Sequence, residues 1–170
     1  WKKIFTLIRF RYGNINRVNS TVNIPLSTLN RNTHKMNSFS NFGLQTEILK
    51  AISELGFESP TPIQSKTIPH LLSTNQDLIA SAQTGTGKTA AFGLPSIQLA
   101  QVEDKSTQTL VLCPTRELCV QIARDLADYS KYMKGIKISA VYGGASIQPQ
   151  IKSLKKGAQI VIGTPGRAKD

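Results

Sequence analysis

The sequence predicts an α/β fold in which helices cover both faces of a parallel β-sheet. Short runs that are apolar throughout, such as "TLVL" and "IVIG", recur after stretches with helical spacing of apolar residues. A glycine-rich turn, "GTGKT", separates one apolar run from a helical stretch. The 170 residues suffice for about one domain, and no apolar run is long enough to span a membrane.

The first elements after the N-terminal region are predicted to be two helices. Five apolar residues fall at helical spacing: Leu44, Ile48, Leu49, Ile52 and Leu55. Gly56 follows them as a stop signal. The loop "FESPTP" then leads to a second helix over about residues 63–72.

Strands and helices alternate from there to the last residue. The predicted strands are "DLIAS", "QTLVLCP", "IKISAVYG" and "AQIVIGT", and the predicted helices cover about residues 88–99, 117–132 and 147–154. We expect the sheet to be incomplete at the C-terminus, with an unpaired edge next to the last strand. A fold with such an edge is expected to be marginally stable or to aggregate.

Residues 1–35 differ from the rest and are predicted to be a basic, polar leader that is disordered or non-native. They hold seven Lys or Arg and no acid, and show no sustained helical or strand period. Because the chain opens on Trp1, we interpret Met36 as the native start; an organelle-targeting segment is the alternative. The net charge of +11 fits a nucleic acid partner, but a solvated basic surface explains it equally well.

The two cysteines, Cys113 and Cys119, lie six positions apart with no His or further Cys nearby. A metal site would need more ligands. We therefore expect both to be reduced, buried side chains of a cytoplasmic protein.

The stretch "AQTGTGKT" is predicted to bind phosphate, although Ala82 replaces the first glycine of the common pattern. Gly85 and Gly87 allow backbone N–H groups to turn toward a phosphate at the start of the following helix. Lys88 is expected to reach the β and γ phosphates, and the Thr89 hydroxyl to ligate Mg²⁺. A glycine-rich turn that binds nothing is the alternative.

Hydrolysis of a bound nucleotide needs a carboxylate that holds the metal and orients water, usually at the end of another apolar strand. None of the acids after the loop ends an apolar run: Glu103, Asp104, Glu117, Asp125, Asp128 and Asp170. On its residues alone, the chain is expected to hold a nucleotide without hydrolysing it.

Five segments, in order, resemble motifs of the DEAD-box family of ATP-dependent RNA helicases over about residues 37–170. "GFESPTPIQ" is similar to the family's Q motif, with Phe39 as the upstream aromatic, and "AQTGTGKT" to motif I, which also begins with Ala. "PTREL" resembles motif Ia, "GG" the paired glycines and "TPGR" motif Ib. The resemblance implies a RecA-like P-loop NTPase fold, with residues 36–170 forming part of the first helicase domain.

The resemblance implies ATP and Mg²⁺ as cofactors. The residues implied to bind the nucleotide are Phe39, Phe57, Pro62, Gln64, Ala82, Gln83, Thr84, Gly85, Thr86, Gly87, Lys88 and Thr89. Lys88 and Thr89 are the implied catalytic residues, because they position the phosphates and the metal. Gln64 is expected to bond the adenine edge and Phe39 to stack on the base; a core aromatic is the alternative for Phe39.

The resemblance also implies binding of single-stranded or duplex RNA through its sugar-phosphate backbone. The implied residues are Pro114, Thr115, Arg116, Gly143, Gly144, Thr164, Pro165, Gly166 and Arg167. Hydroxyl and guanidinium groups suit phosphate oxygens, and glycines let backbone amides approach them. For Arg116 alone, a surface salt bridge would be the default interpretation.

The sequence holds neither the family's Asp-Glu-Ala-Asp and Ser-Ala-Thr segments nor its second RecA-like domain. We therefore expect a monomeric, cytoplasmic parent that couples ATP hydrolysis to RNA unwinding, and an inactive fragment. One alternative is a naturally short module that binds nucleotide and RNA without hydrolysis. Another is a different phosphate-loop enzyme, such as a nucleoside kinase, which gives no reason for "GFESPTPIQ".

Overall fold

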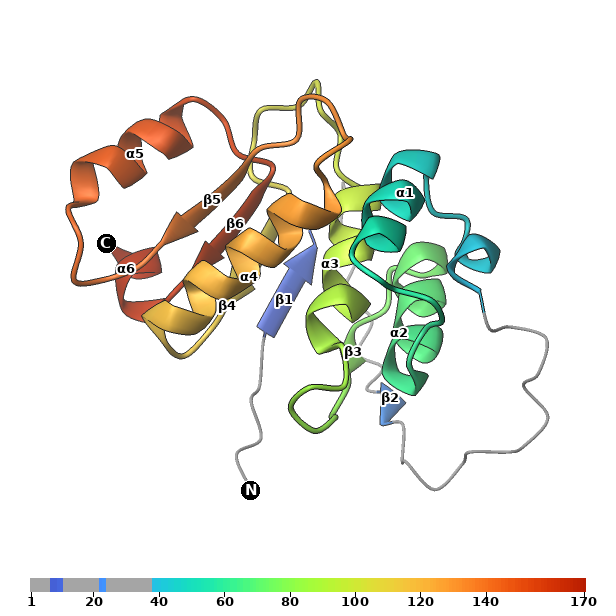
Figure 1. The fold of residues 1–170 in the computed structure, drawn as a ribbon. Coiled ribbons are helices and arrows are strands. Elements are labelled where there is room, and N and C mark those ends of the chain that lie inside the picture. The colour runs from blue at the N-terminus through green and yellow to red at the C-terminus, as the bar shows by residue number, and fades with distance from the viewer. Residues whose placement is uncertain (1–6, 11–21, 24–37) are drawn as a thin grey trace.

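The computed structural model describes residues 7–10, 22–23 and 38–170 (Figure 1). Its helices are η2 (Phe39–Phe42, a 3-10 helix), α1 (Thr46–Glu54), α2 (Pro62–Ser73), α3 (Lys88–Gln98), α4 (Arg116–Tyr129), α5 (Ile147–Lys155) and α6 (Pro165–Lys169). Its strands are β1 (Leu7–Phe10), β2 (Val22–Asn23), β3 (Leu78–Ile79), β4 (Thr109–Leu112), β5 (Ile138–Val141) and β6 (Ile160–Gly163). Every helix and strand predicted from residue 44 onward is present, whereas η2 and α6 were not predicted.

The predicted parallel sheet is present in β4, β6 and β5, which lie side by side in that order (Figure 1). Leu112 of β4 and Val141 of β5 both stand opposite Gly163 of β6. The carboxyl ends of the three strands therefore lie level with one another, and the loops that follow them leave from the same edge of the sheet.

The prediction of an unpaired edge next to the last strand is wrong. β6 lies between β4 and β5 and pairs with both, because the connection through α5 returns the chain to the inner side of β5. The other edge of β4 pairs with β1 in antiparallel orientation, with Leu7 opposite Leu112.

The strand before the phosphate loop, β3, pairs in parallel with β2, with Val22 opposite Leu78. Within the described residues, β3 does not join the four-stranded sheet. No strand was expected in the leader, yet β1 and β2 both come from it. The rest of the leader prediction falls on residues 1–6, 11–21 and 24–35, which lie outside the described residues.

Helices cover both faces of the sheet, as predicted. Ile138 and Ala140 of β5 pack against the main core, to which α4 contributes Leu126. The residue between them, Ser139, points to the opposite face because side chains alternate along a strand. There its hydroxyl lies 2.6 Å from the hydroxyl of Ser153 on α5.

Local chemistry fixes the helix ends nearest the loops. Pro62 opens α2, and Thr61 with Gln64 forms a capping box at that end. Thr115 caps α4 by accepting a hydrogen bond from the Leu118 N–H at 3.3 Å. The longest described helix, α4, has 14 residues, and none of the described helices combines the length and apolarity needed to cross a bilayer.

Both cysteines are free and buried, as predicted, with Cys113 1% and Cys119 0% exposed. Burial raises the pKa of the Cys113 thiol from 9.0 to about 12, and it also raises the pKa of Cys119. The thiolate is the reactive form, so neither thiol is suited to nucleophilic chemistry in the folded chain.

We predict that both thiols resist a disulfide reagent at pH 8 in the folded chain. The raised pKa leaves Cys113 about a thousandfold less thiolate than an ordinary thiol, and burial blocks access to it. Labelling in buffer should be at least about a hundredfold slower than in urea. Equal rates in the two conditions would contradict the burial.

The raised pKa of Cys113 also makes the free energy of unfolding depend on pH. Because the folded chain holds the thiol proton more tightly than the unfolded chain, the stabilisation by the neutral thiol is complete below about pH 9 and is lost as the pH rises toward 12.

Leu126→Ala is predicted to lower the free energy of unfolding by about 2–5 kcal/mol, because it opens a cavity in the core. Leu126 is 0% exposed and packs so closely on α3 that a Cβ at Gly93 would lie 2.8 Å from its Cδ1. Urea unfolding followed by circular dichroism measures the change. The control is Leu154→Ala, at a position 37% exposed, which should change stability by less than about 0.5 kcal/mol.

Candidate functional site

The phosphate loop between β3 and α3 folds around the side chain of Lys88. Its ammonium donates to the carbonyl oxygen of Ala82 at 2.8 Å and to that of Gln83. Gly85 and Gly87 adopt φ angles of 78° and 81°, in the left-handed region that favours glycine. Partial burial of the loop lowers the pKa of Lys88. The cation is therefore held by the backbone carbonyls of the loop itself.

The segment "PTPIQ" is hydrogen-bonded to this loop. The Thr61 hydroxyl donates to the carbonyl of Thr86 at 2.9 Å, and the Gln64 side chain donates to the carbonyl of Gly87 at 3.1 Å. The other end of the Gln64 amide accepts the Thr61 N–H at 2.9 Å. Gln64 is only 2% exposed. Its amide is thus used at both ends inside the protein and would have to leave these partners to bond an adenine.

Phe39, which is expected to stack on a base, packs in the hydrophobic core in this structure. Its ring is 5% exposed and stands 5.9 Å from the rings of both Phe42 and Phe57. Phe57 in turn lies 5.8 Å from Tyr129 of α4. This aromatic cluster supports the segment that presents Gln64, and stacking of Phe39 on a base stays a prediction that requires the ring to become more exposed.

The remaining residues predicted to bind nucleotide lie in or beside the loop. Gln83 and Thr84 are exposed, and Thr86 donates its hydroxyl to the carbonyl of Gln83 at 2.8 Å. Thr89 is half-buried in the first turn of α3. These positions agree with a loop that wraps a phosphate, because its outer rim is polar and open.

The residues around Thr89 fit a Mg²⁺ ion to which the protein contributes one ligand, the Thr89 hydroxyl. The part of the chain that the structure describes holds no group of three or more His, Cys, Asp or Glu able to bind a metal. Mg²⁺ keeps several waters and is often bound through phosphates with few protein ligands. None of the described strands ends in Asp or Glu, so the acid needed for hydrolysis is missing from these positions.

The three predicted RNA-contact segments follow β4, β5 and β6 and meet at the carboxyl edge of the sheet, where open α/β sheets bind ligands. The exposed members are Pro114, Thr115, Arg116, Gly143, Gly144, Pro165 and Gly166, and the half-buried members are Thr164 and Arg167. The parallel register thus brings together residues up to about fifty positions apart in the sequence.

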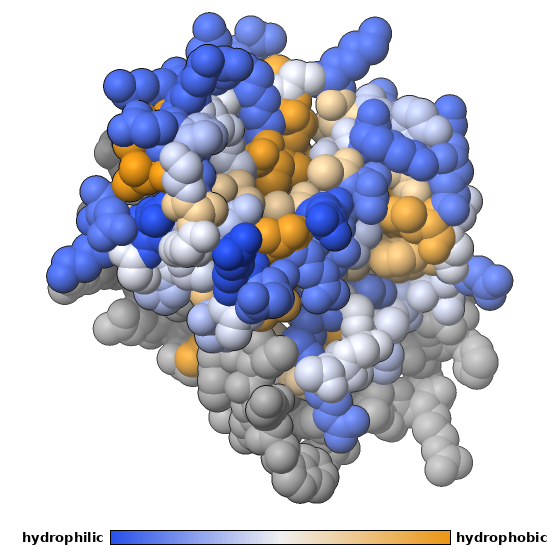
Figure 2. Space-filling view, turned by 60° about the vertical axis from the view of Figure 1, so that its left-hand side comes forward, coloured by the Kyte–Doolittle hydropathy of each residue, from blue (hydrophilic) through white to orange (hydrophobic). Residues whose placement is uncertain are grey.

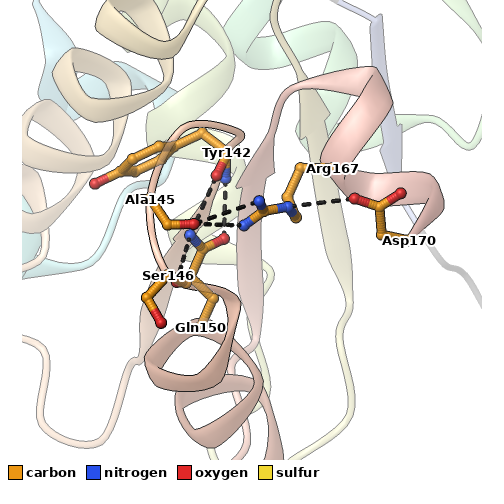
Figure 3. A network of polar contacts seen from close by, with 6 residues as sticks. All are labelled: Tyr142, Ala145, Ser146, Gln150, Arg167 and Asp170. Carbon is orange, nitrogen blue, oxygen red and sulfur yellow. Dashed lines mark hydrogen bonds and ion pairs between the residues drawn. The ribbon is translucent and has the colours of Figure 1, made fainter.

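Two arginines tie these segments to one another. Arg116 donates to the carbonyl of Gly144 at 3.3 Å, and its guanidinium lies 5.1 Å from the centre of the Tyr142 ring. Arg167 donates through both terminal nitrogens to the carbonyl of Ala145 at 3.3 and 3.4 Å (Figure 3). The surface salt bridge considered for Arg116 is not present among the described residues, whereas Arg167 pairs with Asp170 at 3.3 Å.

Sequence reasoning missed two residues of these sites. Thr61 shares the bonds between the "PTPIQ" segment and the phosphate loop. Gln150 of α5 bonds both backbone groups of Tyr142 at 3.1 Å. Neither pairing follows from periodicity. The one available signal for Thr61 was its place three residues before Gln64, which is the spacing of a capping box.

The side of the molecule that carries α5 and α6 is turned forward in Figure 2. Hydrophilic residues cover much of the described surface there, with smaller hydrophobic areas between them. This surface suits a polar partner better than an extended apolar one.

Comparison with known proteins identifies related sequences. The sequence model of the DEAD/DEAH box helicase family matches residues 61–170. The chain is 50% identical over 133 residues to the ATP-dependent RNA helicase DeaD of Escherichia coli (strain K12), covering 78% of this chain and 21% of the relative. It is 53% identical over 135 residues to the ATP-dependent RNA helicase CshA of Listeria monocytogenes, covering 79% and 26%. The chain therefore spans about a fifth to a quarter of these relatives.

Two solved structures resemble the fold. A DEAD box protein from the hyperthermophile Methanococcus jannaschii has a TM-score of 0.71 at 44% identity, over 78% of this chain and 36% of that one. A variant of S. cerevisiae Dbp5 bound to RNA and ADP BeF3 has a TM-score of 0.66 at 36% identity, over 78% and 33%. Together with the family match over residues 61–170, these likenesses show that the chain belongs to the DEAD/DEAH box helicase family.

Proposed function

We propose that this chain is the ATP-binding and RNA-binding portion of an ATP-dependent RNA helicase, whose whole protein couples ATP hydrolysis to unwinding or remodelling of RNA duplexes. The observation that carries the proposal is the bonding of the "PTPIQ" segment to the phosphate loop through Thr61 and Gln64. It joins a group able to read a base to a loop able to hold phosphates. The names of DeaD and CshA, and the RNA and ADP BeF3 bound to the Dbp5 variant, support it.

On the nucleotide side, the ammonium of Lys88 exchanges the carbonyls of Ala82 and Gln83 for phosphate oxygens. A phosphate carries full negative charge, so it competes well against carbonyl dipoles for a cation. Gln64 exchanges Thr61 and Gly87 for the adenine edge. The Thr89 hydroxyl would help to hold Mg²⁺, which would neutralise part of the phosphate charge.

On the RNA side, the loops at the ends of β4, β5 and β6 contact the sugar-phosphate backbone. Thr115 and Thr164 offer hydroxyls, and Arg116 keeps guanidinium N–H groups beyond the one bonded to Gly144. Gly143 and Gly166 have open space where a Cβ would stand. Contacts of this kind position a strand without reading its sequence.

Gly87→Ala is predicted to weaken ATP binding by at least about tenfold, because a Cβ would lie 2.3 Å from the Gln64 amide nitrogen at a φ of 81°. Titration with a fluorescent ATP analogue measures the affinity. The matched control is Gly56→Ala, which has the same φ of 81° but no atom within 4 Å of the new Cβ. Both variants carry backbone strain, and only Gly87→Ala should lose affinity. Equal affinity of the two would contradict the proposed site.

The 170-residue chain is predicted to show no RNA-stimulated ATP hydrolysis, because none of its described strands ends in the carboxylate that hydrolysis requires. Phosphate release in the presence of single-stranded RNA should equal that of a Lys88→Ala control, while ATP binding by the unaltered chain is retained. Turnover above the control would mean that another acid of this chain acts in catalysis.

A further inference from the structure

The loop that carries Gly143 and Gly144 is bracketed by a single amide side chain. Gln150 accepts the Tyr142 N–H at 3.1 Å and donates to the Tyr142 carbonyl at 3.1 Å and to the Ser146 carbonyl at 3.3 Å (Figure 3). An amide side chain offers the same donor and acceptor as a peptide group. Gln150 therefore pairs with Tyr142 as a neighbouring strand would, at the point where β5 has ended.

These bonds determine which backbone groups of the loop are already hydrogen-bonded and which stay free. The carbonyls of Tyr142 and Ser146 are used by Gln150, while Arg116 and Arg167 use the carbonyls of Gly144 and Ala145. Among the described residues, the N–H groups of Gly143 and Gly144 have no hydrogen-bond partner, and both glycines are exposed. Exposed backbone N–H groups on neighbouring residues are suited to binding an anion.

The attachment of α5 makes Gln150 more important than a surface glutamine. No residue of α5 is fully buried, and its apolar side chains Ile147 and Ile151 are only half-buried, so apolar packing holds the helix less firmly than a buried face would. Its described polar attachments to β5 and the loop after it are Gln150 on Tyr142 and Ser153 on Ser139. Loss of the Gln150 amide therefore frees the loop at the end nearest the paired glycines.

We infer that Gln150 is a positioning residue for RNA: it holds the loop so that the N–H groups of Gly143 and Gly144 meet a phosphate of the bound strand. The inference rests on the proposed RNA-binding function and deepens it. Gln150 does not touch the RNA itself. It acts through the backbone of Tyr142 and Ser146.

The test is RNA binding by Gln150→Met in the 170-residue chain, because methionine preserves the shape of the side chain and removes its amide. Fluorescence anisotropy with a labelled oligouridylate should show affinity reduced about fivefold or more, as expected for lost hydrogen bonds that hold a binding group. Affinity for a fluorescent ATP analogue should stay unchanged, and circular dichroism should show that the variant stays folded at the temperature of the assay. The matched control is Gln148→Met, an exposed glutamine of the same helix with no described side-chain bond, which should bind RNA normally.

The outcomes separate this inference from the proposed function. If the unaltered chain binds RNA, and Arg116→Ala weakens that binding while Gln150→Met does not, the positioning role is wrong and the proposed function stands. If the unaltered chain does not bind the oligouridylate at all, the RNA-binding proposal itself fails. If Gln150→Met loses ATP affinity to the same extent as RNA affinity, the residue contributes to stability alone and the inference is overturned.

Amide hydrogen exchange in the unaltered chain decides the matter if Gln150→Met does not fold. The Tyr142 N–H, bonded to Gln150, should exchange slowly, and the N–H groups of Gly143 and Gly144 should exchange fast until RNA protects them. Fast exchange at Tyr142, or no protection of the two glycines by RNA, would overturn the positioning role.

Discussion

The arrangement of the loops proposed to contact RNA depends on the position of β6 between β4 and β5. All four residues of β6 are buried, and the pairing continues past the strands, where the Cys113 N–H donates to Gly163 and the Thr164 N–H donates to Val141, both at 3.0 Å. A Cβ at Gly163 would lie 2.8 Å from a methyl group of Val141, so glycine permits this close approach. The level ends of the strands then place three distant loops at one edge.

At both candidate sites, a cationic side chain donates hydrogen bonds to carbonyl groups of a loop. Lys88 donates to loop carbonyls on the nucleotide side, as Arg116 and Arg167 do on the RNA side. Each cation donates to at least one loop carbonyl, which helps to keep its loop in shape without a ligand. A phosphate can then replace a carbonyl at little cost in ordering, because the loop is already folded. The link from Gln64 to Gly87 extends this arrangement to the base side of the nucleotide site.

Sequence patterns predicted the elements that depend mainly on residues close together in the chain. Helical spacing, apolar runs and the "GTGKT" turn give the helices, the parallel strands and the phosphate loop, and the ordered motifs give the family. Pairing between distant segments left no such signal, so the insertion of β6, the pairing of β1 with β4 and the bonds of Gln150 were missed. For Phe39 the motif indicates an open ring, whereas the apolar neighbours Phe42 and Phe57 bury it in this structure, so its stacking on a base stays a prediction.

The most direct test of two separate binding sites is a ¹⁵N NMR titration of the 170-residue chain with a non-hydrolysable ATP analogue and Mg²⁺, and separately with oligouridylate. The nucleotide is expected to shift the amide signals of residues 61–64 and 82–89. RNA is expected to shift those of residues 114–116, 143–146 and 164–167. Shifts confined to other residues, or one common set of shifts for both ligands, would contradict the presence of two separate sites.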